Sequence, residues 1–382
     1  MDVDRSPRRV LVACTGAYFA VRAGQLALSP VLPAVVDDLG LSTASVGLAL
    51  TAMWLAYAAA QLPSGLLAAR LGGRRTVTIS LIGVAVGTAC VSFAGSTVAL
   101  VAAVALIGAA AGLYYNAGAS LLAMAFDELG QPLGLHKLGS RGAGVVTPVV
   151  AAGLLAAAGW RSVPTATALA ALLGVVVVTR GIPASSGTGD ARSLRSGLGA
   201  AIAAFRRPAV ARTTLFTAAG EFVEQAVLSF LPTLFVAARG VSVGVAAGLF
   251  AVTFVAAAAI GPVAGHLADR YSGRALAAAT MAGGVLGFPV VLYAPIPALP
   301  VGAALIGLSM GWTAPLQSRV LAAFAGDDRD VGFGVYRTVY LALGSLGSVV
   351  TGSIAAHAGW DVAGVALAAV LGLAALGLAV EG

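Results

Sequence analysis

The stretch that decides the fold is GLLAARLGGR at residues 65–74, because the chain carries it again as GHLADRYSGR at residues 265–274. The same shift of 200 residues, without a gap, aligns further pairs elsewhere: Gln25/Gln225, Leu28/Leu228, Ser29/Ser229, Gly134/Gly334, Lys137/Arg337, Gly144/Gly344 and Gly159-Trp160/Gly359-Trp360. Shared apolar composition would produce scattered Ala and Leu matches, but not charged and Gly-Trp matches in one register. The chain is therefore predicted to consist of two related halves.

Composition places both halves in a lipid bilayer. Of 382 residues, 59% are hydrophobic and only 10% are charged, and the mean hydropathy is +0.97. A soluble exterior of this size needs more charge than 22 Lys and Arg with 15 Asp and Glu supply. The net charge of +7 does not indicate nucleic-acid binding, because the basic residues are scattered singly between apolar runs.

Twelve apolar runs are long enough to cross a membrane, which takes about 20 helical residues. They lie at about 10–34, 44–69, 74–94, 97–124, 135–158, 162–180, 209–237, 243–268, 274–294, 298–324, 332–357 and 361–380. We expect an all-α membrane protein with two pseudo-symmetric six-helix bundles. Residues 1–180 are predicted to form the first bundle, 181–207 a cytoplasmic linker and 208–382 the second bundle.

The arginines and lysines of the loops predict the orientation, since cytoplasmic loops carry an excess of both. With the N-terminus inside, fourteen arginines fall in inner loops, and only Arg161 and Arg239 fall outside. Both chain ends and the linker are therefore expected on the cytoplasmic side of the cell membrane.

The repeated stretch resembles the signature loop of the major facilitator superfamily, roughly Gly-x-x-x-Asp-Arg-x-Gly-x-Arg-Arg, and the resemblance extends over essentially the whole chain. The matching residues are Gly65, Arg70, Gly72, Arg74 and Arg75 in the first copy and Gly265, Asp269, Arg270, Gly273 and Arg274 in the second. Ala69 replaces the first acidic position, and Ser272 replaces a glycine. Residues 159–161, Gly-Trp-Arg, also resemble the family.

This resemblance implies a secondary transporter that works by alternating access. It also implies that the signature loops form a conformational latch, comprising Gly65, Arg70, Arg74, Gly265, Asp269, Arg270 and Arg274. Ala69 removes the acid from the first half of the latch, so Asp269 is expected to pair elsewhere, for example with Arg319. A second interpretation is that these charges only fix the orientation. Arg22 followed by Pro30 further resembles the first helix of cyanate-type anion porters.

Two polar stripes at helical spacing are the candidate transport residues. The first span carries Thr15, Tyr18, Arg22, Gln25 and Ser29, and the seventh carries Thr214, Thr217, Glu221, Glu224 and Gln225. Arg22 and Glu221 each lie about twelve residues into their span, near the middle of the bilayer. Charges at that depth are costly and are usually functional.

The hypothesis is that Glu221 or Glu224 binds a coupling proton and that Arg22 binds an anionic substrate group or acts as a counter-ion. A buried structural ion pair between Arg22 and one glutamate is the other interpretation. The substrate or coupling set comprises Arg22, Gln25, Asn116, Arg141, Glu221, Glu224 and Gln225.

Uptake of an organic or inorganic anion with protons is the function we expect. Proton-driven efflux of drugs or metabolites and a non-transporting receptor are the alternatives. The sequence contains no Walker A, HExxH or Gly-x-Ser-x-Gly motif, so neither an enzyme nor a metal or cofactor site is predicted. The expected partners are a small solute, protons and the bilayer, with a monomeric chain.

Overall fold

The computed structural model describes residues 7–126, 130–183, 205–268, 271–321 and 329–380, and the regular secondary structure of this part of the chain is entirely helical. Within it, twelve helical segments are long and apolar enough to cross a membrane. They match the twelve apolar runs to within a few residues, so the predicted fold class is confirmed. The predicted bundle limits stay a prediction, and most of the 181–207 linker lies outside the described residues.

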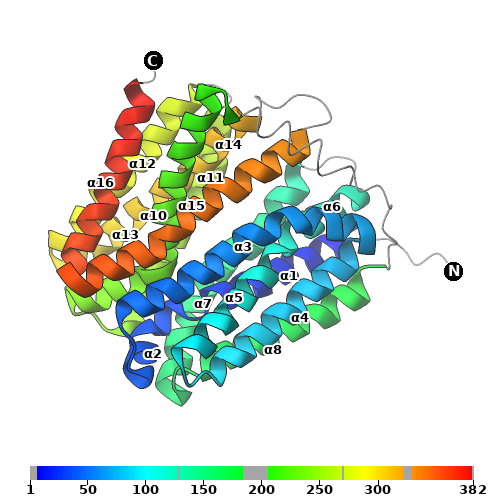
Figure 1. The fold of residues 1–382 in the computed structure, drawn as a ribbon, viewed down its shortest axis with the longest axis horizontal. Helices are drawn as coiled ribbons and strands as arrows, with labels where there is room; N and C mark the ends of the chain where they lie inside the picture. Colours follow the sequence, from blue (N-terminus) through cyan, green and yellow to red (C-terminus); the bar gives the residue numbers. More distant parts are fainter. Residues whose placement is uncertain (1–6, 127–129, 184–204, 269–270, 322–328, 381–382) are drawn as a thin grey trace. The chain divides into compact units, whose positions relative to one another are not determined.

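The chain divides into two compact units (Figure 1). Unit 1 comprises Met1–Leu39 and Ala52–Arg192, and unit 2 comprises Gly40–Thr51 and Ser193–Gly382. The start of α3 (Thr43–Leu71) therefore packs with unit 2, although it belongs to the first half of the sequence.

Unit 1 is built around α1, which packs along α7 and α8, while α4 packs on α5 and α8. Its elements are α1 (Pro7–Leu26), η1 (Ser29–Val31), α2 (Leu32–Leu39), most of α3 (Thr43–Leu71), α4 (Gly73–Ser92), α5 (Thr97–Gly112), α6 (Tyr114–Ala125), α7 (Gly130–Ala158) and α8 (Ser162–Gly181). The first and fourth predicted spans are each divided. The helix ends ahead of Pro30 in the first, and it breaks at Leu113 in the fourth.

Unit 2 repeats this packing around α10, which lies along α15 and α16, while α12 packs on α13 and α16. Its helices are α10 (Pro208–Arg239), α11 (Val243–Ala268), α12 (Gly273–Tyr293), η2 (Ile296–Ala298), α13 (Leu299–Ser309), η3 (Met310–Trp312), α14 (Thr313–Leu321), α15 (Arg329–Ala358) and α16 (Trp360–Val380). The η3 turn interrupts this span near the point where Leu113 interrupts its counterpart.

The backbone also follows the repeat. Gly40 and Gly240 adopt φ values of 61° and 67°, and Gly159 and Gly359 adopt 76° and 90°. Side chains disfavour this left-handed region, so glycine ends these helices at equivalent places in both halves. The internal repeat read from the sequence is thus present in the three-dimensional structure.

The signature loops differ where the sequences differ. Gly72 precedes α4 with φ 84°, whereas Ser272 precedes α12 with φ −58°. A serine avoids the positive φ that glycine accepts, so the second loop reaches its helix by another path.

Candidate functional site

The polar stripe of α1 forms a cluster of hydrogen-bond donors in unit 1. Arg22 donates from Nη1 to Oε1 of Gln25 at 3.1 Å, as their spacing of three residues allows. The guanidinium carbon lies 5.4 Å from the centre of the Trp54 ring, on α3. This distance is within the range of a cation–π interaction.

Two N–H groups of this cluster are unused. Nε of Arg22 and Nε2 of Gln25 are buried, and neither has a hydrogen-bond partner in the described part of the chain. Since the Gln25 oxygen accepts from Arg22, its amide nitrogen is left as a donor. Buried donors without a partner are costly, so a site that keeps two of them side by side is suited to binding an acceptor.

Unit 2 carries an acidic counterpart on α10. Gln225, at the position equivalent to Gln25, donates its Nε2 to the Glu221 carboxylate. The side chain of Glu221 is 7% exposed, whereas Glu224 is half-buried. The oxygen of the Gln225 amide is buried and has no hydrogen-bond partner among the described residues. The two equivalent glutamines are therefore oriented in opposite senses, one by a cation and the other by an anion.

A close helix approach holds Glu221 in place. Gly344 of α15 lies against this side chain, and a methyl group at Gly344 would come within 2.7 Å of the Glu221 Cβ. One turn earlier on α10, the hydroxyls of Thr217 and Tyr336 are 2.8 Å apart. Both contacts join α10 to α15, which form the most extensive helix pair of the unit.

Asn116 serves the packing of unit 1. Its side-chain amide donates to the backbone carbonyl of Gln61 on α3 at 3.0 Å, and the Ser64 hydroxyl donates to the backbone carbonyl of Leu113 at 2.8 Å. These bonds join α3 to the break between α5 and α6. Arg141 is half-buried on α7, and the structure shows no contact that joins it to Arg22.

The signature-loop residues occupy different surroundings. Arg74 donates to the Thr179 carbonyl at 2.7 Å and so caps the last turn of α8, while Arg70 and Gly65 are exposed. Arg274 is half-buried at the start of α12, and Gly265 belongs to α11. Asp269 and Arg270 lie outside the described residues, so the latch stays a prediction.

A partly buried aromatic cluster in unit 1 was not anticipated from the sequence. It consists of Tyr18 of α1, Tyr114 and Tyr115 of α6, and His136 of α7. The His136 side chain is fully buried although it lies in the second turn of its helix. The spacing of Tyr18 on the polar stripe was visible in the sequence, but its partners come from distant segments and carry no local signal.

The other end of unit 1 is held by an arginine. Arg161 forms a 2.6 Å ion pair with Asp38, stacks on the Trp160 ring at 4.3 Å and donates to the Ala94 carbonyl at 3.4 Å. In unit 2, Arg239 donates to the Leu292 and Ala294 carbonyls. Ala94 and Ala294 are equivalent in the repeat, yet the two arginines are not.

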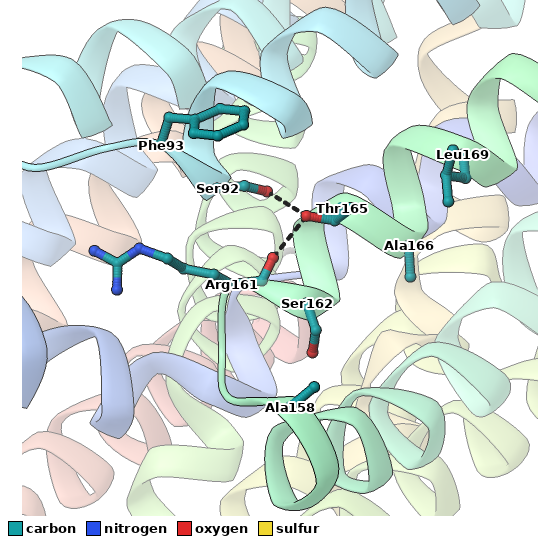
Figure 2. A pocket seen from close by; sticks show the side chains of 8 residues that line it. All are labelled: Ser92, Phe93, Ala158, Arg161, Ser162, Thr165, Ala166 and Leu169. Carbon is teal, nitrogen blue, oxygen red and sulfur yellow. Dashed lines mark hydrogen bonds between the residues drawn. The ribbon is translucent and has the colours of Figure 1, made fainter.

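An open pocket of about 640 Å³ lies beside Arg161 at the ends of α4, α7 and α8. Figure 2 shows its eight lining residues and the bonds of Thr165 to Ser92 and Arg161, with the guanidinium extending away from Thr165. Phe93 and Leu169 in its wall are 87% and 62% exposed. None of the predicted site residues lines this apolar crevice.

The comparisons with known proteins agree with this architecture. The sequence profile of the Major Facilitator Superfamily matches residues 14–256 and 213–380. Among solved structures, a nucleoside transporter has a TM-score of 0.85 at 13% identity, with 97% of this chain and 99% of that chain covered. A D-xylose–proton symporter has a TM-score of 0.78 at 14% identity, with 98% and 97% covered.

A curated relative is the "Probable sulfoacetate transporter SauU" of Cupriavidus necator. It is 29% identical over 146 residues, which is 38% of this chain and 34% of the relative. The match thus spans about a third of the relative's length.

Twelve apolar helices with an internal repeat, together with the fold shared with these neighbours, define a multi-pass membrane protein, and the family match makes it a transporter of small molecules. The chain belongs to the Major Facilitator Superfamily.

Proposed function

We propose that this transporter takes up a small organic anion together with protons. The observation that carries the proposal is the donor cluster of α1, in which the buried N–H groups of Arg22 and Gln25 have no acceptor among the described residues. A carboxylate or sulfonate would supply that acceptor and neutralise the guanidinium. Charge-assisted bonds of this kind are roughly twice as strong as neutral ones.

The geometry of the cluster favours an anion over a neutral solute. Gln25 and Trp54 hold the guanidinium through a hydrogen bond and a ring face, and neither contact neutralises its charge. The name of the Cupriavidus necator relative supports the same class, because sulfoacetate carries one carboxylate and one sulfonate. Sulfoacetate is therefore the probe with which to begin.

Glu221 and Glu224 are the proposed proton-binding residues of unit 2. Burial in a medium of low dielectric constant disfavours the charged carboxylate, so such a group can gain and lose a proton during transport. Gln225 donates to Glu221 and would stabilise its charged form. Glu224 is half-buried, so its carboxyl group is the more accessible of the two for proton exchange.

The remaining expectations complete this proposal. The transporter works as a monomer in the cytoplasmic membrane, with both chain ends in the cytoplasm. Arg141 and Asn116 contribute to the substrate path, and the two signature loops act as the latch of the transport cycle.

The experiment is sulfoacetate flux into proteoliposomes under an imposed inward proton gradient. Arg22→Gln should reduce uptake at least tenfold, because it removes the charge that faces the anion, whereas Arg8→Gln, at an exposed site of the same helix, should not. Glu224→Gln should abolish proton-driven accumulation. Unchanged accumulation in a chain carrying both Glu221→Gln and Glu224→Gln would refute the proton-binding role.

The acidic pair of α10 supports a second candidate, proton-driven efflux of cationic or lipophilic compounds. The same variants separate the two functions. An Arg22→Gln protein that keeps full efflux of a lipophilic cation, while no anion is taken up by the wild type, would favour efflux.

A further inference from the structure

His136 occupies a site that neither the family match nor the proposed function assigns. Its side chain is fully buried, and its Nε2 lies 2.9 Å from the Tyr114 hydroxyl. That hydroxyl also donates to the backbone carbonyl of Cys14, which can only accept.

These two bonds determine the tautomer of His136. A tyrosine hydroxyl has one proton, and here that proton points to Cys14. The Tyr114 oxygen must therefore accept from His136, so Nε2 carries the ring proton and Nδ1 carries a lone pair. Nδ1 is buried and has no hydrogen-bond partner within the described ranges.

We infer that His136 is a proton-binding site of the transport cycle, at which Nδ1 takes up the proton and the positive charge strengthens anion binding at Arg22. This inference rests on the proposed proton-coupled anion uptake. It places one coupling proton in unit 1, beside the anion, in addition to any proton carried by α10.

The surrounding rings can accommodate the charge. The Tyr18 ring is stacked on His136 with centroids 4.8 Å apart, and the Tyr114 and Tyr115 rings lie at 5.7 and 6.2 Å. A cation within about 6 Å of an aromatic centroid is attracted to its face. A proton also adds no volume to a packed site.

The titratable groups around the ring leave the added charge without a carboxylate partner in the described structure. Helix α1 brings Cys14 and Tyr18, and α6 brings Tyr114 and Tyr115. The exposed Lys137 follows on α7, and Arg9 and Arg180 lie where α1 and α8 meet, at Gly181. In this inference the anion bound at Arg22 supplies the compensating charge.

Tyr18 connects the two sites. It lies one helical turn before Arg22 on α1, about 6 Å along the axis. A proton on His136 and an anion at Arg22 attract each other, and the low dielectric constant of the protein interior strengthens this attraction. Linkage then requires that each increase the affinity for the other by the same factor, which we expect to be about tenfold.

The direct test is nitrogen NMR of the purified full-length protein labelled with 15N-histidine. The chain has three histidines, so His266→Gln and His357→Gln variants assign the His136 signals without altering that site. We expect the Nε2–H tautomer at neutral pH and a second ring proton within the range from about pH 4 to 7. A His136 that holds only one ring proton throughout this range would overturn the inference.

The coupling to Arg22 can be measured without any substrate. Arg22→Gln removes a nearby positive charge and should increase the protonated fraction of His136 severalfold at a given pH. Arg161→Gln, beyond the far end of α7, should leave that fraction unchanged. An identical titration of His136 in the wild type and in Arg22→Gln would disprove the coupling.

Flux measurements distinguish this inference from the proposed function. His136→Gln keeps a donor toward Tyr114 but cannot take up a proton, so sulfoacetate counterflow should persist while proton-driven accumulation falls about tenfold. If the wild type moves no sulfoacetate, the proposed substrate is wrong, and the NMR result still decides the role of His136. If His136→Gln accumulates sulfoacetate as well as His357→Gln does, the proton-binding role of His136 is rejected.

Discussion

Gly344 has no side chain at the place where α15 meets the buried carboxylate of α10. The Glu221 side chain fills the space that a methyl group would need, so this glycine sets the distance between the two helices. Glycine serves here as a packing residue and not as a flexible one, because α15 is regular on both sides of it.

The change Gly344→Ala should therefore displace Glu221 from Gln225. We expect a loss of stability of about 1–3 kcal/mol, as for other overpacked helix contacts, and weakened proton-driven uptake. Thermal unfolding in detergent measures the first effect. Gly248→Ala is the matched control, because no atom lies within 4 Å of a Cβ at this helical site. Equal unfolding midpoints for the two variants would contradict this account.

Local spacing predicted part of the candidate site and could not predict the rest. The spacing of Arg22 and Gln25 placed them on one face of a helix, and the bond between them agrees with this. His136 gave no such signal, because its neighbours Tyr18 and Tyr114 come from other helices. A histidine near a helix end is commonly exposed, and only long-range packing made this one buried.

At the scale of elements, Thr51 of α3 inserts its hydroxyl into the backbone of α15. It donates to the Ser345 carbonyl and accepts from the Val349 amide, both at 2.9 Å. These are the two groups that bond to each other in a regular helix. Gly47 and Gly352 lie close by and allow the two helices to approach.

Replacing Thr51 with valine should lower the thermal midpoint by a few degrees. The change keeps the side-chain shape and removes one buried hydroxyl with two bonds, which corresponds to about 1–2 kcal/mol. Thr51→Ser keeps the hydroxyl and should retain most of that stability. If the valine variant is as stable as the serine variant, the inserted hydroxyl contributes nothing to the pairing of α3 with α15.

Element boundaries were predictable where the bilayer sets them and not where packing does. Twelve spans follow from length and hydropathy alone. The break at Leu113 does not, because residues 97–124 form one apolar run. The Leu113 carbonyl is instead taken by Ser64, which belongs to another helix.

At the scale of the whole molecule, the distribution of arginines predicts the orientation in the membrane. A fluorescent protein fused after Gly382 should fold and emit in the cytoplasm. Alkaline phosphatase fused after Gly240 should be active on the outer side, because the positive-inside rule keeps the arginine-rich loops in the cytoplasm. An active phosphatase at the C-terminal fusion point would show the reverse orientation.

The arginine bonds at Ala94 and Ala294 bear on the ancestry of the two halves. The acceptor carbonyl occupies the same place in both repeats, but Arg161 directly precedes α8, whereas Arg239 is the last residue of α10. The two halves thus meet the same structural need with different donors. A search for ancestry that aligns only identical residues would miss this shared requirement, whereas one that aligns the acceptor positions would find it. In a synthetic chain made of two copies of the first half, the second copy of Arg161 would stand at position 361, where this chain has Asp361. That arginine would supply the donor for the carbonyl at position 294, so Arg239 would not be needed.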